Sequence, residues 1–163
     1  MNNTLINFSS DPQQLLPLKD TPTIQVIVFG IGQLNLALRV ESIYKVLKQT
    51  QVHSSGLGDI GIAHIGDREV TVLDLQRQLF QTSSLDTQAM SCYLIVATKA
   101  SGELVGIPVD LVPTLLEVPI ALVRVLPASY RQADTLGIAS HVAVIPQESG
   151  SLTLFLVDIE QLL

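Results

Sequence analysis

The chain has 163 residues, of which 47% are apolar, 15% are charged and 4% are aromatic, and Trp is absent. Its core must therefore be built from Val, Ile and Leu, and β-branched side chains favour strands over helices. The net charge of −6 argues against a nucleic-acid-binding protein, because phosphates are neutralised by clustered Lys and Arg. The length suits one compact unit or two small subdomains packed together.

Neither a membrane span nor a disulfide is expected. Mean hydropathy is high, at +0.43, but the best candidate span, residues 21–38, is interrupted by Pro22 and Gly30. A bilayer requires a continuous apolar run of about 20 residues. The N-terminus lacks the charged and apolar regions of a signal peptide. Cys92 is the only cysteine, and we interpret it as a buried structural thiol of a cytoplasmic protein.

Taken in chain order, the sequence predicts an N-terminal arm followed by a series of β-hairpins. Residues 1–22 are rich in Asn, Ser, Gln and Pro, so we expect a flexible arm, with the folded part spanning 23–163. Apolar or alternating runs separated by turn residues predict four hairpins. The paired runs are 24–29 with 34–38, 60–65 with 70–73, 93–98 with 104–109, and 138–145 with 152–157.

Helical signals are few and short. Four apolar residues at helical spacing predict a short helix over residues 40–47. Two further short helices are predicted over 74–80 and 158–163. Each would begin at an aspartate, Asp74 or Asp158, whose carboxylate can accept hydrogen bonds from the first free backbone N–H groups.

Short segments recur in the same order along the two halves of the chain. The matching pairs are 36–47 with 105–116, 61–63 with 137–139, and 72–79 with 156–163. This order favours an internal duplication, with similar halves over about 23–90 and 91–163. Two all-β subdomains of similar design follow, each with about five strands, the usual number for a small closed or half-closed barrel.

Patterns that would indicate catalysis or ligand binding are incomplete. Residues 56–61 match the glycine pattern GxGxxG, but they lack the preceding strand and following helix of a dinucleotide site, so we interpret them as a connecting loop. His53, His64 and His141 have no second ligand at metal-binding spacing. We therefore predict no catalytic, metal-binding or cofactor-binding residue and no enzyme activity. An enzyme or small-ligand binder remains the third alternative.

Four segments, in order, resemble the CheW-like domain family. The family hallmark, approximately G-V-x-N-L-R-G-x-x-x-P-V-[VI]-D-L, compares with GIAHIGDREVTVLDL at residues 61–75. Residues 26–47 resemble the family's first hairpin and the helical turn after it. Residues 105–119 resemble its V-G-[LI]-x-V-D-x-V-x-x-V-L segment, and residues 154–163 resemble its closing segment. The resemblance covers essentially everything after the N-terminal arm.

The resemblance implies an all-β fold of two five-stranded β-barrel subdomains packed on a shared apolar core, with a few short helices. It also implies a non-catalytic cytoplasmic adaptor of chemosensory signalling, without a cofactor. Such an adaptor bridges the cytoplasmic tip of chemoreceptors and the regulatory domain of a CheA-type histidine kinase, and so controls motility. It would reach membrane receptor arrays only through these partners, without inserting into the membrane and without binding nucleic acid.

By the same resemblance, a receptor-facing groove is predicted at Ile43, Lys45, Ile65, Gly66 and Arg68. This chain departs from the family there. Where the family reads N-L-R-G, the chain reads H-I-G-D, so Gly66 replaces the arginine and Arg68 follows two residues later. Lys45 stands where the family usually has glutamate. An alternative is therefore a divergent CheW-like interaction module with another partner, for example in a different taxis or pilus-motility pathway, without normal receptor contact.

Overall fold

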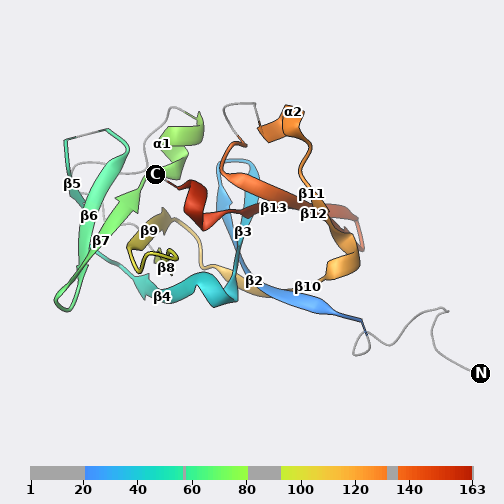
Figure 1. Ribbon diagram of the computed structural model, residues 1–163, viewed down its shortest axis with the longest axis horizontal. Helices are drawn as coiled ribbons and strands as arrows, with labels where there is room; N and C mark the ends of the chain where they lie inside the picture. The colour runs from blue at the N-terminus through green and yellow to red at the C-terminus, as the bar shows by residue number, and fades with distance from the viewer. Residues whose placement is uncertain (1–20, 57, 81–92, 132–135, 163) are drawn as a thin grey trace, which may run out of the picture.

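The computed structural model describes residues 21–56, 58–80, 93–131 and 136–162. Nearly all of the expected N-terminal arm over 1–22, and Cys92, lie outside these residues. Two six-stranded sheets, joined by short helices, make up the described part (Figure 1). In these same residues, no helix is both long enough and apolar enough to cross a membrane.

The first sheet, here called sheet 1, has the strand order β10-β2-β3-β13-β12-β11. Its strands are β2 (Thr23–Ile31), β3 (Leu34–Arg39), β10 (Thr114–Pro119), β11 (Val123–Val125), β12 (Ala139–Gln147) and β13 (Gly150–Val157). Neighbouring strands are antiparallel except for β13 and β3, which pair in parallel.

The second sheet, sheet 2, has the order β4-β8-β9-β7-β6-β5. Its strands are β4 (Ile43–Lys48), β5 (His53–Ser54), β6 (Ile60–Ile65), β7 (Arg68–Leu73), β8 (Tyr93–Thr98) and β9 (Leu104–Val109). Here β7 and β9 form the parallel pair. The five strands predicted for each unit correspond to the five longer strands of each sheet. The sixth, β5 or β11, has only two or three residues.

The two sheets repeat one plan. The parallel pairs of the two sheets occupy equivalent positions of the sequence repeat. The equivalent residues, sheet 1 first, are Leu36 and Val105, Ala37 and Gly106, Phe155 and Thr71, and Leu156 and Val72. Each sheet also takes a hairpin from one half of the chain and its other four strands from the opposite half. The two halves of the sequence are therefore interleaved in space.

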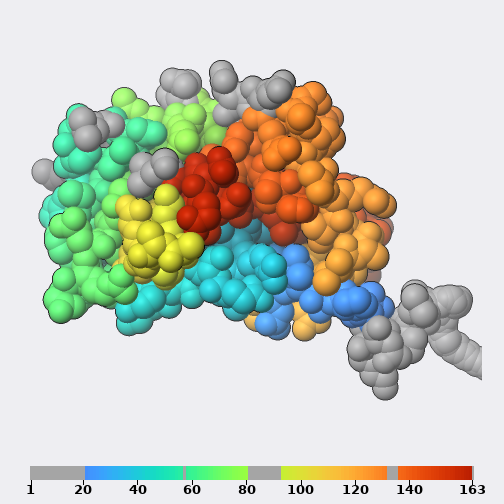
Figure 2. Space-filling model, in the orientation of Figure 1, coloured from blue at the N-terminus to red at the C-terminus, as the bar shows by residue number. Residues whose placement is uncertain are grey.

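Among the described residues, the core forms three apolar clusters, one inside each sheet and one shared between them. Strand β9 contributes to two of these clusters, because successive side chains of a strand point to opposite faces of the sheet. Val105, Ile107 and Val109 enter the shared cluster, whereas Leu104 enters the cluster of sheet 2. Ile159 and Leu162 near the C-terminus join the shared cluster, and this segment fills the junction between the sheets (Figure 2). The predicted shared apolar core is thus confirmed.

A short helix follows one strand of each sheet and contacts the other sheet. Helix α1 (Leu75–Phe80) follows β7, and the 3₁₀ turn η4 (Ile159–Gln161) follows β13. As predicted, an aspartate caps each: Asp74 Oδ1 accepts from the N–H of Arg77 at 3.1 Å, and Asp158 Oδ1 accepts from the N–H of Glu160 at 3.1 Å.

The residue two places after each aspartate reaches the opposite sheet. Gln76 Oε1 accepts from the N–H of Gly32 in the β2–β3 turn at 3.1 Å, and Glu160 Oε2 accepts from the N–H of Ala100 in the β8–β9 turn at 2.8 Å. These two braces, together with the shared cluster, tie the sheets to one another.

The helix predicted over residues 40–47 is wrong. Only η2 (Val40–Ser42) is helical, and β4 follows directly. Strand β4 has a β-bulge, because its pairing with β8 shifts between Ile43–Ala97 and Lys45–Val96 and leaves Tyr44 as the extra residue. The bulge interrupts the two-residue alternation, and the resulting apolar spacing imitates that of a helix.

Candidate protein-binding surface

The hairpin of β6 and β7 carries three of the predicted site residues. Ile65 and Arg68 form its last cross-strand pair, and Gly66 and Asp67 make the turn. Gly66 has a φ of +60°, a left-handed conformation that glycine adopts at little cost, and glycine at the first turn position is typical of a type II′ turn. A Cβ at Gly66 would meet no atom within 4 Å. The backbone conformation thus accounts for this glycine.

Arg68 connects three segments at this end of sheet 2. Its Nη2 donates to the carbonyl oxygen of Gly102 in the β8–β9 turn at 3.0 Å. Its Cζ lies 5.5 Å from the centre of the Tyr44 ring on β4, within the range of a cation–π interaction. Although its side chain is exposed, the guanidinium is therefore held over β4 by two neutral groups.

The pairing register decides which β4 residues share this surface. Lys45 pairs with Val96, whose side chain lies in the cluster of sheet 2, so both residues face that cluster. Ile65 packs against the same cluster. Ile43 instead pairs with Ala97 and packs against the shared cluster. The structure thus brings Ile65, Gly66 and Arg68 together at one hairpin end, places Lys45 on the same face of the sheet, and turns Ile43 toward the shared cluster.

We call the resulting patch the Arg68 surface and define it by five residues: Tyr44, Lys45, Ile65, Arg68 and Gly102. The sequence did not single out Tyr44 or Gly102, because only the bulge and the turn pairing bring them beside Arg68. Within the described residues, neither Lys45 nor Arg68 forms an ion pair with a carboxylate.

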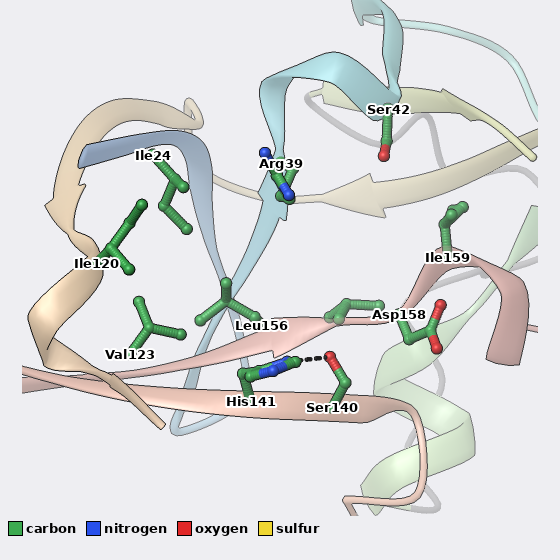
Figure 3. A pocket seen from close by; sticks show the side chains of 11 residues that line it. Ile24, Arg39, Ser42, Ile120, Val123, Ser140, His141, Leu156, Asp158 and Ile159 are labelled. Carbon is green, nitrogen blue, oxygen red and sulfur yellow. Dashed lines mark hydrogen bonds between the residues drawn. The ribbon is translucent and has the colours of Figure 1, made fainter. Parts of the chain in front are cut away.

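A cavity of about 530 Å³ lies elsewhere, beside η2 on the side of sheet 1 (Figure 3). Aliphatic side chains such as Ile24, Ile120 and Val123 line one part of it. Ser140 Oγ lies 2.8 Å from His141 Nδ1, at the place where the register of β12 with β13 shifts. None of the five predicted site residues lines this cavity.

An ion pair borders the same cavity. Arg39, which lines it, contacts Glu41 with 3.2 Å between Nε and Oε1. The backbone N–H of Glu41, and secondly the Arg39 guanidinium, lower the pKa of the Glu41 carboxyl below its usual range. Both side chains are largely exposed, so the pair adds little to stability.

The patterns that suggested ligand sites in the sequence do not form them. The last glycine of GxGxxG, Gly61, lies within β6, and a Cβ there would approach the carbonyl oxygen of His53 to 2.9 Å. This glycine therefore allows β5 to lie close to β6, and a strand stands where a dinucleotide site needs a helix. Among the residues that the structure describes, no three His, Cys, Asp or Glu side chains gather to hold a metal ion.

Comparison with known families decides the classification. The family model of the CheW-like domain matches residues 25–163. The chain belongs to the CheW-like domain family. The match includes every residue of the Arg68 surface and both sheets, apart from the first two residues of β2.

A solved structure agrees with this fold. The CheW-like chain is similar to the crystal structure of the scaffolding protein TtCheW from Thermoanaerobacter tengcongensis, with a TM-score of 0.67 and 13% sequence identity. The similarity covers 90% of this chain and 88% of that chain. No curated protein matches the sequence. The all-β fold with two sheets and few helices is thus confirmed.

Proposed function

We propose that this CheW-like protein is a non-catalytic adaptor that couples chemoreceptors to a CheA-type histidine kinase. The observation that carries the proposal is the family match over residues 25–163. The likeness to a structure named as a scaffolding protein agrees with it. The adaptor acts in the cytoplasm, at receptor arrays that it reaches through its partners, and it controls motility by setting kinase activity.

Its mechanism is positional. The shared cluster and the braces at Gln76 and Glu160 hold the two sheets as one body. A receptor bound to one face and a kinase bound to another are then kept in a fixed relation, so a change in the receptor shifts the conformational equilibrium of the kinase. We assign the receptor to the end of sheet 2 that contains the Arg68 surface.

A second candidate is a CheW-like module with a different partner. The observation that favours it is the charge at the predicted groove, where Lys45 and Arg68 are exposed and Gly66 carries no side chain. Such a module would bind neither the receptors nor the kinase of the main chemotaxis pathway and would act in another taxis or pilus-motility system.

The test is co-elution of the full-length protein with purified partners from its own organism. We expect a stable complex with the regulatory domain of a CheA-type kinase, and a ternary complex once a soluble receptor-tip fragment is added. Binding to neither partner would overturn the adaptor role. Binding only to a kinase of another motility system would favour the second candidate.

A further inference from the structure

The Arg68 surface carries uncompensated positive charge on an acidic protein. The net charge of the chain is −6, yet Lys45 and Arg68 lie on the same face of sheet 2, and Lys45 follows Tyr44, whose ring lies under the Arg68 guanidinium. Arg39 shows the usual arrangement for comparison, because Glu41 neutralises it at 3.2 Å. Arg68 is held by a carbonyl oxygen and an aromatic ring, neither of which removes its charge.

The neighbouring acidic residues that the structure describes form no ion pair with Arg68. Glu69 is next to Arg68 in sequence, but successive residues of a strand point to opposite faces, and Glu69 contacts His64 at 3.9 Å on the other face. Asp67 in the turn and Glu103 beside Gly102 are exposed and form no ion pair with Arg68.

Apolar surface lies beneath the charges. The Tyr44 side chain is 42% exposed under the Arg68 guanidinium, and Ile65 is half-buried next to it. An exposed aromatic ring combined with a positioned arginine is the composition of an interface hot spot. Because Arg68 is already held in place, less side-chain entropy is lost when it binds a carboxylate.

Protection against aggregation could explain Lys45 but not Arg68. Lysine on an edge strand discourages unwanted strand pairing, and β4 is the edge strand of sheet 2. Arg68, however, lies on β7, an inner strand of the sheet that pairs with β6 along its length and with β9 at Thr71 and Val72. The corresponding repeat positions in sheet 1, Thr114 and Leu152, are uncharged. The fold plan therefore does not require a cation at either place.

From these observations we infer that the Arg68 surface binds an acidic segment of a receptor tip, with carboxylates opposite Lys45 and Arg68 and an apolar side chain packed on Tyr44 and Ile65. The inference rests on the proposed adaptor function and names the charge of the partner at this surface. A glutamate at position 45 would favour a basic partner segment. Lys45 instead favours an acidic one.

The experiment measures affinity for a soluble receptor-tip fragment and, separately, for the kinase regulatory domain. Lys45→Glu and Arg68→Glu are each expected to weaken receptor binding about tenfold or more, because each places like charges together. Raising NaCl from about 0.05 M to about 0.5 M should weaken native binding and reduce the difference between the variants. Arg124→Glu, an exposed residue on β11 with the same change in net charge, is the matched control and should bind as the native chain does.

Reversal in the partner completes the test. Changing the carboxylates of the receptor segment to lysine should restore binding of the Arg68→Glu protein and abolish binding of the native protein. Urea unfolding of each variant, together with the milder Arg68→Gln, separates loss of charge from loss of folding.

The outcomes distinguish this inference from the adaptor role. If the protein binds both the receptor and the kinase, and neither Lys45→Glu nor Arg68→Glu weakens receptor binding, the inference is overturned and the adaptor role stands. Binding to neither partner would overturn both. Charge-dependent binding of the native chain to phosphatidylserine vesicles or to a DNA duplex, without receptor binding, would overturn the assignment to a protein segment.

Discussion

Sheet 1 and sheet 2 share their strand order and their parallel pairing but differ in exposed charged residues. In both, an aspartate caps a short helix and a nearby side chain braces a turn of the opposite sheet. In sheet 2, Lys45 and Arg68 are exposed, whereas Thr114 and Leu152 take their repeat positions in sheet 1.

The features that both sheets share account for the fold, and the exposed cations that only sheet 2 has at these positions point to function. One strand order, one parallel pairing and one shared cluster produce both sheets without any contribution from Lys45 or Arg68. The fold therefore leaves Lys45 and Arg68 available for the binding role that we propose. Changes to the shared plan, in contrast, should affect stability.

The largest effect is expected in the shared cluster. Leu38 and Ile107 hold equivalent repeat positions and are 1% and 0% exposed. Leu38→Ala and Ile107→Ala should each lower the free energy of unfolding by about 2–5 kcal/mol, through lost burial and the cavity that remains. Because both residues belong to one cluster, urea unfolding followed by circular dichroism should show a single transition for either variant.

Val125, which is 66% exposed on β11, provides the control for this experiment. Val125→Ala should change the free energy of unfolding by no more than about 0.5 kcal/mol. Two separate transitions, or a large loss in only one of the core variants, would show that the sheets unfold independently and would contradict a shared core.

An intermediate effect is expected at two turn glycines. Gly32 in the β2–β3 turn and Gly66 in the β6–β7 turn have similar φ values of +58° and +60°. Gly66→Ala should cost about 1–2 kcal/mol from backbone strain alone, since its surroundings are open. At Gly32 a Cβ would lie 2.7 Å from the Phe80 ring of α1, so Gly32→Ala should cost about 1–3 kcal/mol more.

Truncating the ring separates the two causes. In a Phe80→Ala background, Gly32→Ala should cost about as much as Gly66→Ala does in the native chain, because only the strain remains. An unchanged extra cost in that background would mean that α1 does not pack on the β2–β3 turn as the structure shows. The same strain makes Gly66→Arg a poor probe of binding, because it alters the turn as well as the surface.

Most strands could be predicted because local signals and tertiary packing agree. Each predicted hairpin combines an apolar or alternating run with a glycine-containing turn, and β8 and β9 have the predicted bounds. The shared core was correctly expected from the family resemblance. The prediction for residues 40–47 was wrong because the bulge at Tyr44 arises from pairing with β8. The local spacing of apolar residues contains no information about that pairing.

The binding surface was predictable only in part, for the same reason. Ile65, Gly66 and Arg68 are close in sequence and form one hairpin end, so a motif could locate them together. Tyr44 joins them through the bulge, and Gly102 through a hydrogen bond across 34 residues of sequence. Ile43 was assigned to the groove, but its pairing with Ala97 turns it toward the shared cluster. Whether the remaining residues bind a partner stays a prediction.

The smallest effect concerns the two chain crossovers between the sheets, at Glu41 and at its repeat counterpart Asp110. Arg39 pairs with Glu41, but Pro108 stands at the repeat position of Arg39, so this ion pair has no counterpart in the second half. The Arg39–Glu41 pair is complete at neutral pH and is lost only as the pH falls through the lowered pKa of Glu41, because protonation removes the carboxylate charge.

Arg39→Gln should raise the pKa of Glu41 only part of the way toward its usual value, since the backbone N–H of Glu41, the larger cause, remains. A carbon-detected NMR titration of the Glu41 side chain measures this directly, with Arg124→Gln as the control that removes a distant arginine. A complete return to the usual value in Arg39→Gln would mean that the guanidinium, and not the local backbone, sets the ionisation of this crossover.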